Sequence, residues 1–230
     1  MHNIHDQRLL IVDFGSQYTQ LIARRVRECG VYCEIYSYDI DDAFLQEFAP
    51  QGVILSGGPE TVTTGETPRL AEAILELGVP VLGICYGMQT LAEQLGGRVQ
   101  ASAKREFGHA EVTAEQPSAL IGSLGATQIS SADVWMSHGD KVIEVPPGFV
   151  VTASTSSAPI AAMEDSERHI YGVQFHPEVT HTANGNALLA VFALEICGCK
   201  GDWTAENIIE DAIAHVREQV GDDEVVLGLS

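Results

Sequence analysis

The sequence predicts an α/β fold: an open, mostly parallel sheet flanked by helices, with an added region of antiparallel strands. In the N-terminal half, short runs that are apolar throughout alternate with segments of helical periodicity. Such runs are typical of strands buried on both faces, and their alternation with helices is typical of βαβ units. After Gly97, short strand patterns follow one another, which indicates antiparallel pairing.

Local patterns give the N-terminal elements. Gly30 stands where a helix C-cap belongs, and Pro68 suits the first turn of a helix. Right-handed connections between the strands would cover both faces of the sheet. The expected strands are residues 9–12, 32–38, 52–56 and 79–84, and the expected helices are 18–29, 68–77 and 88–95.

The second half adds strands and two helices. A helix at 184–196 is expected to close a domain that spans residues 1–200. Residues 201–230 form a separate segment, with a helix at 205–220 and an apolar strand at 225–230 that ends abruptly, as if a further domain followed. The other expected strands lie around residue 98 and at 110–112, 134–136, 149–153, 160–163 and 170–175.

Composition excludes several classes of protein. The net charge of −20 opposes binding to phosphate backbones, so no nucleic-acid partner is expected. No apolar run is long enough to span a membrane, and the polar opening lacks the apolar core of a signal peptide. Five cysteines with irregular spacing indicate reduced thiols and a cytoplasmic protein.

The paired cysteines do not predict a metal site. Cys29 with Cys33, and Cys197 with Cys199, lack the two tight CxxC pairs of a structural zinc site. We therefore expect buried or inert thiols there, and no metal.

The segment 83–87 carries the sharpest chemical signal. Cys85 stands between Gly83 and Gly87, after an apolar strand and before a helix, which is the nucleophile-elbow pattern. Glycines leave room for a strained turn, and the helix N-terminus favours the reactive thiolate. The alternative is a buried cysteine in a tight turn.

A base for this nucleophile follows a later strand. His176 could take the proton of Cys85 and return it to a leaving amine. Glu178 could orient the imidazole, and Pro177 between them restricts the backbone. We therefore expect Cys85, His176 and Glu178 to form a catalytic triad.

Attack on an amide also requires donors for the oxyanion. The backbone N–H of Tyr86, next to the nucleophile, is one candidate, and the paired glycines Gly57 and Gly58 supply the other. The segment 137–140 contains Ser, His138, Gly and Asp and could bind a polar substrate. His109 and His215 are expected to be structural.

Three motifs together resemble the class I (triad) glutamine amidotransferases. They are the elbow 83–89, the glycine loop 55–59 and the segment 174–178, which occur in the family's order. The segments 13–21, 134–142 and 176–182 further resemble the amidotransferase domains of GMP synthetases, and 225–230 is similar to the start of their second domain.

The resemblance implies roles for individual residues. Cys85 would form a γ-glutamyl thioester, with Gly58 and Tyr86 N–H groups holding the oxyanion. Gln89, Gly139 and Asp140 would bind L-glutamine. No cofactor is implied for this step.

The resemblance also implies partners. Residues 201–230 would be a linker helix and the truncated first strand of an ATP-pyrophosphatase synthetase domain. That domain would use ATP and Mg²⁺ to activate xanthosine monophosphate (XMP) for amination to GMP, and the whole enzyme would be a homodimer. Three alternatives remain: an amidotransferase for another acceptor, a cysteine hydrolase of γ-glutamyl substrates, or a non-catalytic domain.

Overall fold

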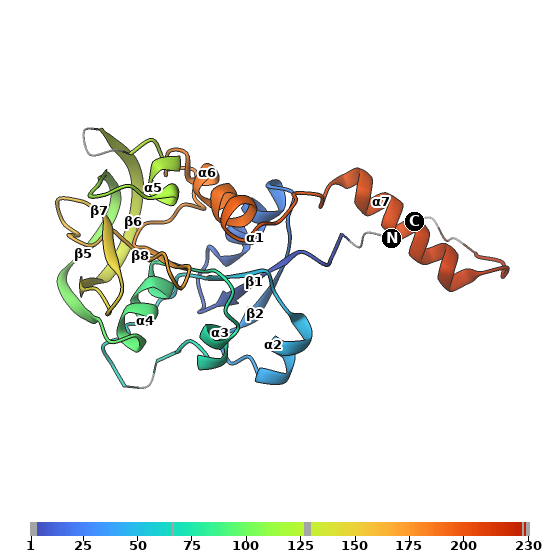
Figure 1. Ribbon diagram of the computed structural model, residues 1–230, viewed down its shortest axis with the longest axis horizontal. Helices are drawn as coiled ribbons and strands as arrows, with labels where there is room; N and C mark the ends of the chain where they lie inside the picture. The colour runs from blue at the N-terminus through green and yellow to red at the C-terminus, as the bar shows by residue number, and fades with distance from the viewer. Residues whose placement is uncertain (1–3, 66, 127–129, 227, 229–230) are drawn as a thin grey trace.

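The computed structural model describes residues 4–65, 67–126, 130–226 and 228 of the chain (Figure 1). Among these residues, nine strands form one sheet in the order β2-β1-β3-β4-β9-β8-β7-β5-β6. The strands are β1 (Arg8–Asp13), β2 (Tyr32–Ser37), β3 (Gly52–Leu55), β4 (Val81–Ile84), β5 (Arg98–Ala114), β6 (Ser131–Glu144), β7 (Val150–Ser154), β8 (Ala162–Asp165) and β9 (Ile170–Val173).

One half of the sheet is parallel. Strand β1 pairs with β2 and β3, β3 pairs with β4, and β4 pairs with β9, all in parallel. Every residue of β3, β4 and β9 is buried, as continuous apolar runs require. The predicted parallel sheet with added antiparallel strands is confirmed.

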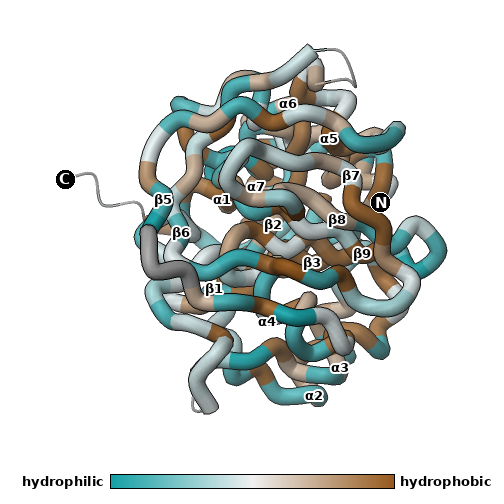
Figure 2. The backbone as a smooth tube through the Cα atoms, turned by 90° about the vertical axis from the view of Figure 1, so that its left-hand side faces the viewer, coloured by the Kyte–Doolittle hydropathy of each residue, from teal (hydrophilic) through white to brown (hydrophobic). Residues whose placement is uncertain are grey.

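Helices cover both faces of this half. Helices α1 (Thr19–Glu28) and α6 (Gly185–Ala190) share one apolar cluster, which takes Leu9 and Ile11 from β1. Helices α2 (Asp42–Phe48), α3 (Glu72–Glu76) and α4 (Tyr86–Gln94) share the other, which takes Leu10 and Val12. Alternate residues of one strand therefore enter opposite cores. Figure 1 shows α1 and α6 on one side and α2, α3 and α4 on the other. In Figure 2 hydrophobic stretches of chain run through the middle of the molecule.

The antiparallel half differs from the expected short strands. The segments predicted around residue 98 and at 110–112 belong to one strand, β5, which pairs with the long strand β6. A register shift between Ala101 and Glu106 lets the pairing continue through a polar stretch. The polar sequence concealed the strand because a bulge breaks the alternation of side chains.

Two helix boundaries were predicted wrongly. The helix expected at 68–77 is shorter and consists of α3 alone. The backbone of Leu70 bonds to a side chain instead of joining the helix: the Gln94 amide accepts from Leu70 N–H at 2.9 Å and donates to Leu70 O at 3.0 Å. The helix expected from residue 88 begins at Tyr86. The expected helix at 184–196 is α6 followed by a π-helical turn, Val191–Ile196.

Two short helices were not expected from the sequence. Helix α2 carries a recognisable signal, because Asp41 caps it by accepting from Phe44 N–H at 2.9 Å. Helix α5 (Ala119–Ser123) begins in the same way with Ser118.

The last described helix, α7 (Ala205–Val220), has the predicted bounds and no buried residue. It extends away from the rest of the molecule (Figure 1). Val225 and Val226 are not in a strand, and the rest of the strand predicted at 225–230 lies mostly outside the described residues. No helix within the described ranges is long and apolar enough to cross a bilayer.

Candidate active site

Cys85 lies at the junction of β4 and α4 with φ of 52° and ψ of −104°. A non-glycine residue in this region is strained, by roughly 1–3 kcal/mol, and such strain is typical of functional sites. A Cβ on Gly83 would lie 2.6 Å from the Gly87 carbonyl carbon, and one on Gly87 would lie 2.5 Å from Leu55 O. Both glycines are therefore required for α4 to pack on β3 and β4, and the segment forms the predicted elbow.

Cys85 is 5% exposed and lies at the N-terminus of α4. Its Sγ is 3.6 Å from Ser137 O, and the Gln174 amide nitrogen is 3.7 Å from the same sulfur. The sulfur therefore has a carbonyl acceptor and an amide donor beside it, at the start of a helix.

His176 follows β9, and its Nδ1 is 2.7 Å from Glu178 Oε1. The backbone N–H of His176 donates to Trp135 O at 3.0 Å, and the Thr182 hydroxyl donates to the backbone carbonyl of His176 at 2.6 Å. The backbone of this residue is thus tied to β6 and to the following loop. The imidazole and the carboxylate are almost fully buried and are held in one geometry.

The pKa of His176 is raised well above its usual value of 6.5. Burial opposes the charged form, but hydrogen bonds and charge attraction from Cys85 and Glu178 outweigh it. An imidazolium beside a sulfur is the state in which a proton has moved from thiol to base. The fully buried Glu178 has no hydrogen bond to its Oε2 among the described residues, so its charge is directed mainly at His176.

Gly58 and Tyr86, the expected oxyanion donors, lie side by side. A Cβ on Gly58 would come within 2.8 Å of Phe14 O and 3.3 Å of the Tyr86 ring. Tyr86 is the first residue of α4, so its N–H has no helical acceptor one turn earlier. The Tyr86 hydroxyl donates to Pro68 O at 2.6 Å, which fixes this side chain.

A cavity of about 880 Å³ opens beside Cys85 and His176. Its wall comes from the loops after β1 and β3 and from the hairpin β5–β6. The charged residues in the wall are Glu60, Arg105 and Asp140, together with the histidines 138 and 176. A cavity with both signs of charge suits a zwitterionic ligand such as an amino acid.

Of the three residues predicted to bind substrate, two line the cavity and one does not. Gly139 and Asp140 line the cavity, and the Asp140 carboxylate accepts a hydrogen bond from the Thr61 hydroxyl. Gln89 lies behind this wall, 3% exposed, and its amide donates to Asp140 O at 2.8 Å and to Gln174 Oε1 at 3.3 Å. A direct role of Gln89 in substrate binding stays a prediction.

Arg105 is a cavity residue that sequence reasoning missed. Among the described residues of the wall it is the one Lys or Arg, and its Nε lies 3.7 Å from the Cβ position of Gly139. Basic residues are few in this chain, 12 against 32 acidic ones, so each Lys or Arg was a candidate for binding an anionic group. Its neighbourhood could not be read from sequence, because the bulged hairpin brings it to Gly139.

The remaining cysteines and two of the histidines lie outside the cavity wall. All five cysteines are free, and burial raises the pKa of Cys33 and of Cys199 to about 11 each. Cys29 and Cys197 also have raised pKa values because of burial. His109 pairs with Asp133 at 2.7 Å on the exposed hairpin, and His215 lies on α7, 3.3 Å from Asp211.

Two solved structures with similar folds can be compared with this chain. A candidate GMP synthase subunit from Thermoplasma acidophilum is 29% identical, with a TM-score of 0.72 over 91% of this chain and 99% of that one. A glutamine amidotransferase from Methylobacillus flagellatus shares the fold, with 20% identity and a TM-score of 0.59 over 76% of this chain and 71% of that one.

Curated relatives are far more similar in sequence. GMP synthase [glutamine-hydrolyzing] from Vibrio vulnificus is 61% identical over 99% of this chain and 43% of the relative. The protein of the same name from Photobacterium profundum is 59% identical, over 99% of this chain and 44% of the relative. The chain therefore spans less than half the length of these relatives.

The family model for class-I glutamine amidotransferases matches residues 10–196. This range contains the elbow, the glycine loop, the His176–Glu178 pair and the whole cavity wall. By this match and by its relatives, the chain belongs to the class-I glutamine amidotransferase family.

Proposed function

We propose that this chain hydrolyses L-glutamine to glutamate and ammonia through a thioester on Cys85. The observation that carries the proposal is the strained Cys85 at a helix N-terminus, which shares a cavity with His176 while that imidazole is bonded to the buried Glu178. These groups supply a nucleophile, a base and an orienting acid for the base.

The first half-reaction forms the thioester. The Cys85 thiolate attacks the side-chain amide carbon of glutamine, and the amide oxygen becomes an oxyanion. The N–H groups of Gly58 and Tyr86 hold that charge. The imidazolium of His176 gives its proton to the leaving nitrogen, so that the C–N bond breaks and ammonia departs.

The second half-reaction releases glutamate. Neutral His176 takes a proton from water as that water attacks the thioester carbon. The C–S bond then breaks, and glutamate leaves with Cys85 restored as thiolate and His176 as imidazolium. Glu178 stabilises the imidazolium in both halves and holds the ring in one orientation.

The cavity wall would hold the amino-acid end of glutamine. Arg105 offers a guanidinium to the α-carboxylate, and Asp140 offers a carboxylate to the α-ammonium group. Gly139 between these charges lets the substrate approach the backbone. Gln89 contributes from behind the wall by fixing the Asp140 carbonyl.

We further propose that the ammonia serves GMP synthesis. The relatives named GMP synthase [glutamine-hydrolyzing] extend well beyond this chain. A synthetase domain in that remainder would adenylate XMP with ATP and Mg²⁺, and ammonia would displace AMP. The whole enzyme would be a cytoplasmic homodimer. The glutamine steps above use only groups of the present chain.

Residues 201–230 would connect the two domains. Helix α7 exposes apolar side chains at Ile209, Ile213 and Val216, which lie on one side of a helix at this spacing. Such a stripe is unfavourable in water, and the synthetase domain would cover it.

Ammonia release tests the proposal. Release from glutamine would be measured with the chain and with Cys85→Ala, each with and without a synthetase domain, ATP, Mg²⁺ and XMP. Cys85-dependent release that rises with the loaded partner supports both proposals. Release that is unchanged by the partner supports the proposed glutaminase activity and argues against the proposed XMP amination. No release under any condition from a folded chain refutes both.

A further inference from the structure

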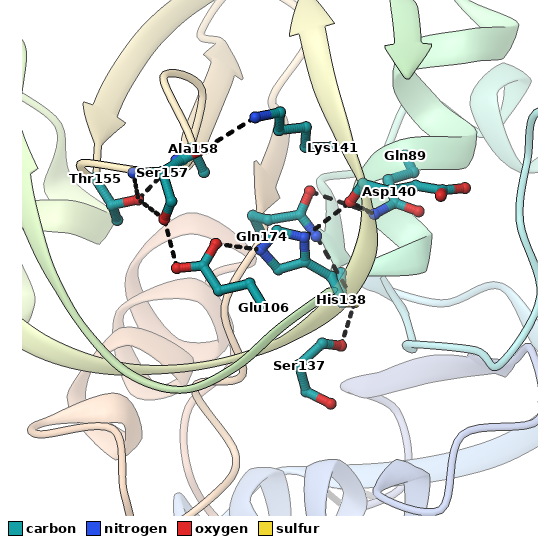
Figure 3. Close-up of polar contacts among 11 residues, drawn as sticks. Gln89, Glu106, Ser137, His138, Asp140, Lys141, Thr155, Ser157, Ala158 and Gln174 are labelled. Carbon is teal, nitrogen blue, oxygen red and sulfur yellow. Dashed lines mark hydrogen bonds and ion pairs between the residues drawn. The ribbon is translucent and has the colours of Figure 1, made fainter. Parts of the chain in front are cut away.

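Two hydrogen-bond donors converge on the backbone carbonyl of one residue of the cavity wall. Asp140 O accepts from the Gln89 amide at 2.8 Å, and His138 Nδ1 lies 2.9 Å from the same oxygen (Figure 3). Asp140 and the preceding Gly139 line the cavity. Gln89 and His138 therefore both restrain this short stretch of wall, and His138 also lines the cavity.

The other ring nitrogen of His138 faces a carboxylate, and among the described residues it has no hydrogen-bond partner. The residue is 7% exposed, and Nε2 lies 3.2 Å from Glu106 Oε2 on the paired strand β5. The other carboxylate oxygen of Glu106 accepts from the Ser157 hydroxyl, and Lys141 Nζ donates to Ser157 O at 3.1 Å. Figure 3 shows the resulting chain of contacts from the Ser157 loop to Gln89.

The chemistry of the contacts fixes the tautomer. A carbonyl oxygen can only accept, so His138 Nδ1 must carry the hydrogen. Burial lowers the pKa of His138, although Glu106 and the Asp140 carbonyl act in the opposite direction. The ring is thus suited to donate one fixed hydrogen bond to the wall. It has no part in the proton transfers assigned to His176.

We propose that His138 is a positioning residue for glutamine, which acts through the Asp140 carbonyl. The inference rests on the proposed function. Gly139 has no side chain to restrain its backbone, and Asp140 must present its carboxylate at a defined place. Without the His138 donor, the wall would move and the amino-acid end of glutamine would bind less tightly, while the Cys85 centre would be unchanged.

Binding of L-glutamine to a Cys85→Ala background provides the test, since it needs no turnover. Calorimetry would compare His138→Phe, which loses both contacts, with His138→Asn, whose amide nitrogen can replace Nδ1. His109→Asn serves as the matched control, because His109 lies on the same hairpin but outside the cavity wall. We expect His138→Phe to weaken binding at least tenfold, with His138→Asn within about threefold of the background.

Kinetics of the Cys85 protein separate positioning from chemistry. His138→Phe should raise KM for glutamine at least tenfold with kcat within threefold, and iodoacetamide should label Cys85 at the parental rate. Equal binding by His138→Phe and the background overturns the inference, as does equal weakening by Phe and Asn. Failure of the Cys85→Ala background to bind glutamine would instead count against the proposed function. Circular dichroism of each variant would establish that it is folded.

Discussion

The parallel and antiparallel halves of the sheet contribute different things to the site. The parallel half supplies Cys85 after β4 and His176 after β9, on strands whose residues are all buried. The hairpin β5–β6 supplies Arg105, Gly139 and Asp140, and it exposes 65% of Phe107 at the cavity. Bond making requires placement to a fraction of an ångström, which a packed core provides. Recognition of a flexible amino acid tolerates a wall held by hydrogen bonds.

If this division holds, the largest effect lies at Cys85. Cys85→Ser should lower glutaminase kcat by roughly 10⁴-fold or more, because a serine hydroxyl is far less ionised than a thiol. The fold and glutamine binding should persist. Ammonia release and calorimetry on the same preparation check both, and retained turnover would remove Cys85 from the mechanism.

The next effect distinguishes proton transfer from orientation within the parallel half. His176→Ala should cost more kcat than Glu178→Ala, with the glutamate variant roughly 10- to 100-fold more active. His176 moves the proton, whereas Glu178 only holds and stabilises the ring. Single-turnover thioester formation would be measured for both, and the reverse ranking contradicts these roles.

A third change tests whether core packing maintains the elbow. Gly87→Ala places a Cβ 2.5 Å from Leu55 O. We expect a loss of unfolding free energy of roughly 1–3 kcal/mol from overpacking, together with reduced activity. Gly122→Ala is the control, because nothing lies within 4 Å of its Cβ position. Urea unfolding of both variants gives the comparison, and similar stabilities would mean that the elbow is more adaptable than described.

A recognition effect should appear in the antiparallel half. Arg105→Ala should raise KM for glutamine about tenfold, the value of one charge-assisted hydrogen bond, and leave kcat within about threefold. Arg98→Ala on the same strand, paired with Glu144 and outside the cavity wall, should change neither. A fall in kcat for Arg105→Ala with KM unchanged would place Arg105 in the chemical step instead.

The smallest effects concern the pH dependence of stability. His176 in the parallel half and His138 in the antiparallel half should change stability with pH in opposite directions. The raised pKa of His176 means that the native state retains a proton above pH 6.5, so its stabilisation is lost as pH rises through that pKa. The lowered pKa of His138 means that the unfolded state binds more protons below pH 6.5, so stability rises as pH approaches 6.5. Each slope is at most about 1.4 kcal/mol per pH unit for one proton.

Unfolding by urea between pH 5 and 9 would measure these slopes. His176→Gln should flatten the decline above pH 6.5, and His138→Asn should flatten the rise below it. Unchanged slopes in either variant would contradict the corresponding charge environment.

Local sequence predicted the candidate catalytic residues more completely than the residues of the cavity wall. Gly83, Cys85 and Gly87 form a signal within five residues, because a strained turn and a close helix can be built only by that spacing. His176 and Glu178 are likewise two residues apart and bonded. Arg105 could not be assigned, since the register shift in β5 determines which residues face the cavity.

The sequence by itself determined the alternation of buried strands and helices, the elbow and the His176–Glu178 pair, because each depends on interactions a few residues apart. Only the tertiary structure decided which β5 side chains meet Gly139 and that Gln89 lies behind the wall. It also ended the expected helix at 68–77, because the Gln94 amide bonds both backbone groups of Leu70. These contacts join residues distant in the chain, and hydrogen bonds of that kind override local propensity.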